Sequence, residues 1–101
     1  RRVGLYPSGG FSSKVIEIYQ KMYSNPEFEW FLFNSDIKIW GQQVDGYVVH
    51  APADIPELNL DIILVCTYKY DKEIIDSLRP YEKLGIRIAR LHTDEAVPWI
   101  F

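Results

Sequence analysis

The stretch "VGLYPSGGFSSKVIEIY", residues 3–19, decides the predicted fold. It begins with a short apolar run, passes through Pro, Ser, Gly, Gly and two further Ser, and ends in a segment with helical spacing. This order is typical of a β-strand, a phosphate-binding turn and an α-helix. The strand is expected over residues 2–6. The helix is predicted from an apolar stripe at helical spacing: Val15, Ile18, Tyr19 and Met22.

Later segments of the chain also have the composition of strands. They cover residues 28–34, 47–51, 61–67 and 86–92, and helical segments lie between several of them. The unbroken apolar run "DIILVCT", residues 61–67, is typical of a central strand in a parallel sheet that is covered on both faces. Alternation of strands and helices predicts a three-layer α/β sandwich with a five-stranded parallel sheet in the order 3-2-1-4-5. Leu64 is expected to face the opposite side of the sheet from Ile63. The residues expected to be mostly buried in the core are Leu5, Ile18, Phe31, Phe33, Ile63 and Val65.

Length and composition indicate one folded domain. A chain of 101 residues is a common domain size, and we expect residues 1–101 to form a single domain cut from a longer protein. A net charge of −3 without a basic stripe disfavours nucleic acid. The chain has no apolar run long enough for a membrane span, and its single cysteine fits a reducing compartment, so we expect a cytoplasmic protein. The candidate partners are a neighbouring catalytic domain of the same chain and a second copy in a homodimer.

The predicted topology places a candidate site at the carboxyl ends of the strands. Ligands of open α/β sheets bind where the strand order reverses, between the first and fourth strands of this prediction. Amides of the glycine-rich turn and the dipole of the following helix favour an anion such as phosphate. An ordinary turn in which Ser12 serves as the helix N-cap explains the same residues. The candidate binding residues are Pro7, Ser8, Gly9, Gly10, Phe11, Ser12, Ser13, Asn34, Asp36, Thr67 and Tyr68.

The order of these pieces resembles small Rossmann-like domains attached to enzymes of bacterial carbohydrate and cell-surface polysaccharide metabolism. The resemblance covers residues 3 to about 90 and rests on "LYPSGGFSSK", "FLFNSD", "KIWGQQVDGYVVHAPADI" and "DIILVCTYKYDKEI". It implies a Rossmann-like fold and a nucleotide or nucleotide-sugar ligand.

The sequence departs from this family pattern at the glycine-rich turn. Pro7 stands at the first glycine position, Gly9 matches the second, and Ser12 stands at the third. Asn34 replaces the acid that would bind a ribose, and Asp36 follows two residues later. Because proline fixes its own φ and restrains the residue before it, we expect a stiff exit from the strand that fits a diphosphate poorly. The chain also has only half of a two-part dinucleotide fold, so a mononucleotide or nucleotide-sugar fits better than NAD.

A different resemblance concerns the same turn. "SGGFSS", residues 8–13, is similar to the SGGxDS turn of ATP pyrophosphatases, with Ser12 in place of the acid. That resemblance implies binding of the ATP pyrophosphate, and it stays open as an alternative.

Other reactive side chains have structural explanations. Cys66 has no His or basic residue beside it in sequence, which favours a buried thiol over a nucleophile. His50 and His92 each close a strand without the spacing of a metal site. We therefore assign no catalytic pair and no metal. The expected function is a non-catalytic nucleotide-binding or regulatory module, the alternative is a ligand-free interaction or dimerisation domain, and an autonomous enzyme ranks last.

Overall fold

A computed structural model describes residues 1–22, 28–67 and 69–90 of the chain. It contains one sheet of six strands in the order β3-β4-β2-β1-β5-β6. The strands are β1 (Arg2–Tyr6), β2 (Glu29–Phe33), β3 (Gln43–Val44), β4 (Tyr47–His50), β5 (Ile62–Val65) and β6 (Arg87–Arg90). The helices are α1 (Gly10–Met22) and α2 (Asp71–Leu78), with 3₁₀ helices η1 (Ile37–Ile39), η2 (Pro52–Glu57) and η3 (Arg79–Leu84).

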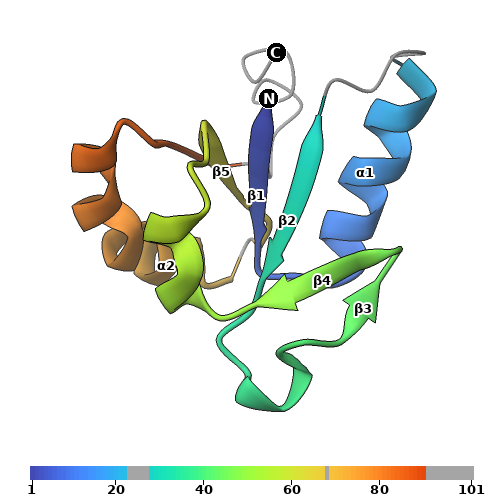
Figure 1. Ribbon diagram of the computed structural model, residues 1–101, viewed down its shortest axis with the longest axis horizontal. Coiled ribbons are helices and arrows are strands. Elements are labelled where there is room, and N and C mark those ends of the chain that lie inside the picture. Colours follow the sequence, from blue (N-terminus) through green and yellow to red (C-terminus); the bar gives the residue numbers. More distant parts are fainter. Residues whose placement is uncertain (23–27, 68, 91–101) are drawn as a thin grey trace.

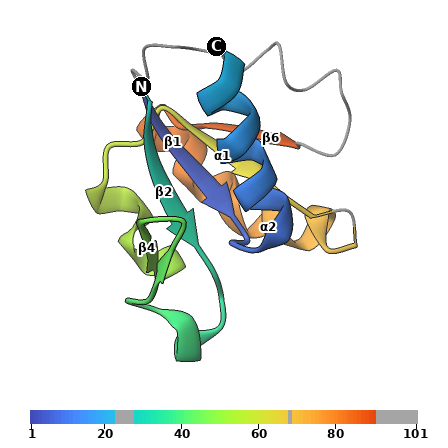
Figure 2. The same ribbon diagram turned by 90° about the vertical axis from the view of Figure 1, so that its right-hand side faces the viewer.

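Two layers of helix cover the sheet (Figure 1). α1 packs its buried residues into one core cluster with Leu5, Leu32 and Leu64. α2, η2 and η3 pack against the other face, where Phe33, Ile63 and Val65 lie. Figure 2 shows α1 lying over the sheet with β1 and β2 behind it. Ile63 and Leu64 therefore face opposite sides, as predicted from strand alternation.

The prediction of five parallel strands is wrong in the number of strands and therefore in the sheet order. β3 pairs antiparallel with β4 through Gln43↔Val48 and Val44↔Tyr47, which adds a sixth strand at one edge. The sequence analysis predicted no strand between residues 34 and 47, because β3 has only two residues and shows no periodicity. Asp45 and Gly46 connect the two strands with φ of 55° and 85°. An Asp-Gly pair with positive φ is the preferred turn of a two-residue hairpin. The sequence "VDGY" therefore indicates the hairpin that the prediction missed. β4, β2, β1, β5 and β6 pair in parallel.

The predicted buried face of the first helix is confirmed at Val15 and Tyr19 and wrong at Ile18. Ile18 is 39% exposed, whereas Ile16 is buried together with Ser12, Val15 and Tyr19. The side chain of Met22 lies outside the described residues. Both stripes have helical spacing, and the observed stripe brings the small Ser12 against the sheet at 0% exposure. Phe31, another predicted core residue, is only partly buried.

The amino ends of the strands are held by one arginine. The Arg2 Nε–H donates to the Leu58 carbonyl oxygen at 2.7 Å, and its Nη1 pairs with Glu29 at 3.1 Å. The guanidinium also lies 4.6 Å from the centroid of the Phe31 ring. These contacts join β1, β2 and the segment before β5 at the end of the sheet that lies away from the candidate site. Among the described residues, none of the helices has the length and apolarity that crossing a bilayer requires.

Candidate functional site at the turn between β1 and α1

The glycine-rich turn lies at the carboxyl end of β1, between β2 and β5. β1 ends at Tyr6, a cis peptide bond joins Tyr6 to Pro7, and α1 begins at Gly10. From β1 the chain builds β2 and β4 on one side and then crosses to β5 and β6 on the other. The turn therefore lies at the reversal of strand order, where open α/β sheets bind ligands.

Two amides of the turn are used within the protein. The Ser8 N–H donates to the Phe33 carbonyl oxygen at 2.7 Å, and the Gly9 N–H donates to Ser12 Oγ at 2.8 Å. The Ser12 hydroxyl in turn donates to the Gly9 carbonyl oxygen at 2.9 Å. Ser12 is the third residue of α1, and its hydroxyl accepts from the N–H of Gly9, the residue just before the helix, as in a capping box. The alternative in which Ser12 is the N-cap is therefore wrong. Gly9 fills the N-cap position.

The remaining part of the turn is open. A methyl group placed on Gly9 or Gly10 meets no described atom within 4 Å. Gly10 opens α1, where the first-turn amides have no intrahelical acceptor. A small anion therefore has room at Gly10, while the amides of Ser8 and Gly9 are not available to wrap a diphosphate. Phe11, the next predicted site residue, packs against the core cluster under α1.

Asn34 and Asp36 were both predicted to belong to the binding site at the turn. In the structure only Asn34 contacts the turn, and Asp36 contacts η1 instead. The Asn34 Nδ2 donates to the Ser8 carbonyl oxygen and to Ser8 Oγ, both at 3.2 Å, so it joins the end of β2 to the turn. The Asp36 carboxylate instead accepts the Lys38 N–H at 3.0 Å and caps η1. The Trp40 indole N–H donates to the Asn34 carbonyl oxygen at 2.6 Å, which fixes the loop beside them.

The opposite wall of the crevice follows β5. The Cys66 N–H donates to the Tyr6 carbonyl oxygen at 2.7 Å, so the ends of β1 and β5 are held together. Burial raises the pKa of the Cys66 thiol to about 12 and also raises the pKa of Tyr6, so both groups stay protonated at neutral pH. Thr67 is half-buried beside them, and Tyr68 lies outside the described residues. In the described part of the chain, this wall pairs no nucleophile with a base.

The histidines form no metal site in the described part of the chain. The His50 ring lies 6.0 Å from Phe31 and 5.8 Å from Phe33 between ring centroids, and its Nδ1 is 3.6 Å from an Asp54 carboxylate oxygen. His92 lies outside the described residues. Residues 1–22, 28–67 and 69–90 contain no group of three side chains suited to a metal ion.

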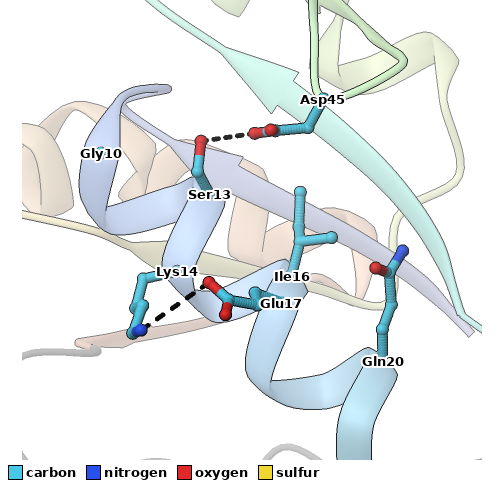
Figure 3. Close-up of a pocket in the computed structure, with 7 residues that line it drawn as sticks. All are labelled: Gly10, Ser13, Lys14, Ile16, Glu17, Gln20 and Asp45. Atoms are coloured by element: carbon cyan, nitrogen blue, oxygen red, sulfur yellow. Dashed lines mark hydrogen bonds and ion pairs between the residues drawn. The ribbon is translucent and has the colours of Figure 1, made fainter.

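A pocket of about 430 Å³ adjoins the turn, along the side of α1 that contacts the β3–β4 hairpin (Figure 3). Its lining is Gly10, Ser13, Lys14, Ile16, Glu17, Gln20 and Asp45. The Ser13 hydroxyl donates to the Asp45 carboxylate, and Lys14 pairs with Glu17 at 3.7 Å. Gly10 and Ser13 are among the residues predicted from the sequence, whereas Asp45 is not, because it comes from the hairpin, 32 positions after Ser13 in the chain.

Solved structures of other proteins share the fold of this chain. No family model matches the chain, and no curated protein matches it. UDP-D-quinovosamine 4-dehydrogenase from Vibrio fischeri superposes with a TM-score of 0.69 at 16% identity, over 98% of this chain and 84% of that chain. RSP, a Rex-family repressor, superposes with a TM-score of 0.59 at 11% identity, over 98% of this chain and 56% of that chain. The chain therefore has a Rossmann-like α/β fold.

Proposed function

We propose that this chain is a non-catalytic, cytoplasmic Rossmann-like module that binds a mononucleotide or nucleotide-sugar weakly. In this proposal it works beside a catalytic domain of a larger carbohydrate-related protein. The observation that carries the proposal is the open backbone at Gly9 and Gly10, at the start of α1 and at the reversal of strand order. Such a position accepts one phosphate through backbone amides and the helix dipole, without a charged side chain.

Hydrogen bonds within the turn favour weak binding of a nucleotide over tight binding of a dinucleotide. The family turn grips a diphosphate with several free amides, whereas here Ser8 and Gly9 donate their amides to Phe33 and Ser12. Asn34 supplies an amide in place of the ribose-binding acid, and that amide is bonded to Ser8. We prefer a nucleotide-sugar as the ligand because one structural neighbour, UDP-D-quinovosamine 4-dehydrogenase, is named for a UDP-sugar.

The absence of a catalytic role is part of the proposal and rests on the chemistry of the crevice. Cys66 is buried and stays protonated at neutral pH, so it is a poor nucleophile. The hydroxyls of Ser12 and Ser13 are bonded to Gly9 and Asp45, and neither is paired with a histidine in the described residues.

Replacing Gly9 with Asp tests the phosphate position. Asp and Asn are equally good N-caps, so Gly9→Asp and Gly9→Asn should both fold, and they differ only in charge. We expect Gly9→Asp to weaken UDP-glucose binding at least about tenfold relative to Gly9→Asn, because a carboxylate would face the phosphate. Titration followed by protein NMR measures both affinities. Equal affinities in the two variants would contradict a phosphate at this turn.

A ligand-free interaction domain is the second candidate function. Three apolar side chains between η1 and β4 are unusually exposed: Ile37 at 69%, Trp40 at 38% and Val48 at 41%. Exposed apolar residues of this kind favour contact with another protein surface. Concentration-dependent dimerisation in analytical ultracentrifugation, together with no nucleotide binding, would favour this role.

A further inference from the structure

The tip of the β3–β4 hairpin contacts the first turns of α1. Asp45 lies at this tip, and its carboxylate accepts the hydrogen bond from the Ser13 hydroxyl (Figure 3). Asp45 is held at φ 55° and is followed by Gly46 at φ 85°, a conformation that only a few residue types adopt readily. A negative charge from a distant part of the chain therefore lies one hydrogen bond from a hydroxyl of the proposed nucleotide site.

The charge of Asp45 is not balanced by the lysine nearest the turn. Lys14 pairs with Glu17 at 3.7 Å, and Glu17 also pairs with Lys21 at 3.0 Å. The hydrogen bond from Lys21, followed by the charges of Lys14 and Lys21, lowers the pKa of Glu17, so this carboxylate is ionised at neutral pH. In the described part of the chain, no cation forms an ion pair with Asp45.

The pocket beside this contact connects Asp45 to the open backbone of the turn. Gly10, Ser13 and Asp45 all line it, so a ligand that reaches Gly10 and the Ser13 hydroxyl lies within a few ångströms of the carboxylate. At such distances two like charges repel, and the repulsion grows with the charge of the ligand. A diphosphate that is esterified at both ends carries less charge than a free triphosphate.

We propose that Asp45 is a specificity-determining residue of this site, which directs it toward nucleotide-sugars and against free nucleoside triphosphates. The carboxylate holds the Ser13 hydroxyl and adds a repulsion that costs a triphosphate more than a sugar diphosphate. This inference rests on the proposed function, since it assigns the selectivity of the same turn.

Two substitutions separate the charge of Asp45 from its hydrogen bond. Asp45→Asn removes the charge but keeps an oxygen that can accept from Ser13. Asp45→Gly removes both the charge and the hydrogen bond. Asn and Gly both tolerate positive φ in a two-residue hairpin turn, so both variants should keep the fold. Asp76→Asn is the control, because it removes the same charge from an exposed position on α2, across the sheet.

The experiment measures the affinities of UTP and UDP-glucose by NMR titration without Mg²⁺, at low and high salt. We expect Asp45→Asn to strengthen UTP binding about three- to tenfold and UDP-glucose binding about twofold at most. Asp45→Gly should strengthen UTP binding at least as much, because the Ser13 hydroxyl is also released. The gain in UTP affinity should be smaller at high salt, because salt screens the repulsion between the charges. Asp76→Asn should leave both affinities within about twofold of the wild type.

The outcomes distinguish this inference from the proposed function. If the wild type binds UDP-glucose and neither Asp45 variant changes the ratio of UTP to UDP-glucose affinity, the selectivity role is wrong and the site remains. If a gain appears but does not depend on salt or on ligand charge, Asp45 only positions the hairpin, and the inference is overturned. If no variant binds either nucleotide, the proposed function and the inference fail together.

Discussion

Replacing Ile63 with Ala should lower the free energy of unfolding by about 2–5 kcal/mol. Ile63 has 0% exposure in the middle of β5 and packs in the cluster beneath α2, η2 and η3. Neighbouring strands pair with it on both sides, through Gly4 of β1 and Ile88 of β6, so the surrounding structure has little freedom to fill the space left by the side chain. Urea denaturation followed by circular dichroism measures the loss.

Ile18→Ala is the matched control for this loss. It removes the same atoms from a side chain that is 39% exposed on the outer side of α1. Because Ala is a better helix former than Ile and little apolar surface is lost, we expect a change of less than about 1 kcal/mol. Equal losses in the two variants, or a loss below about 1 kcal/mol for Ile63→Ala, would contradict the assignment of β5 as a strand buried on both faces of the sheet.

Replacing Gly4 with Ala should lower the free energy of unfolding by about 1–3 kcal/mol, because the added methyl group overpacks the core. Its Cβ would lie 2.9 Å from Phe33 Cε2 and 3.2 Å from both Ile63 Cγ1 and Leu60 Cδ1. Ala is ordinarily favoured over Gly in a strand by about 0.5–1 kcal/mol, so a loss must come from packing. Thermal or urea unfolding measures the difference.

Gly10→Ala is the control for the effect of the added methyl group. A Cβ at Gly10 meets nothing within 4 Å, and Ala suits the first position of a helix. We expect this variant to unfold at the same denaturant concentration as the wild type, or at a slightly higher one. A neutral or stabilising Gly4→Ala would show that β1 lies further from Phe33 and Leu60 than the structure places it.

Patterns that act over short stretches of sequence predicted most of the fold. The apolar run at residues 61–67 predicted the buried strand β5, which lies between β1 and the edge strand β6 and not at the centre of the sheet. Strand alternation placed Ile63 and Leu64 on opposite faces. β3 escaped prediction because two residues carry no periodicity, although the Asp45–Gly46 turn marked the hairpin. On α1, Val15 and Tyr19 were predicted correctly, but Ile18 was chosen in place of Ile16, because the two are equally apolar and only tertiary packing distinguishes them.

The candidate site was less accessible to sequence reasoning. The sequence predicted a turn and then a helix after β1, and in the structure residues 7–9 form the turn and residues 10–13 open α1. The sequence grouped Asn34 with this turn without predicting the contact that it makes with Ser8. It did not predict that Ser12 would bond to Gly9 or that Asp45 would hold Ser13, since both depend on side-chain rotamers and on a hairpin distant in sequence. These two contacts decide how much of the turn remains for a ligand.

The affinity of the wild-type chain for NAD relative to a nucleotide-sugar tests the central claim most directly. Ligand-observed NMR with NAD, ATP and UDP-glucose measures all three in one buffer. We predict a Kd near or above about 0.1–1 mM for UDP-glucose, equivalent to about 4–5 kcal/mol, and weaker or absent binding of NAD. Micromolar ATP binding that is lost in Ser13→Ala would instead favour the pyrophosphatase-like alternative. Micromolar binding of NAD would contradict the account, because a turn that has committed the Ser8 and Gly9 amides to Phe33 and Ser12 lacks the donors for a tightly held dinucleotide.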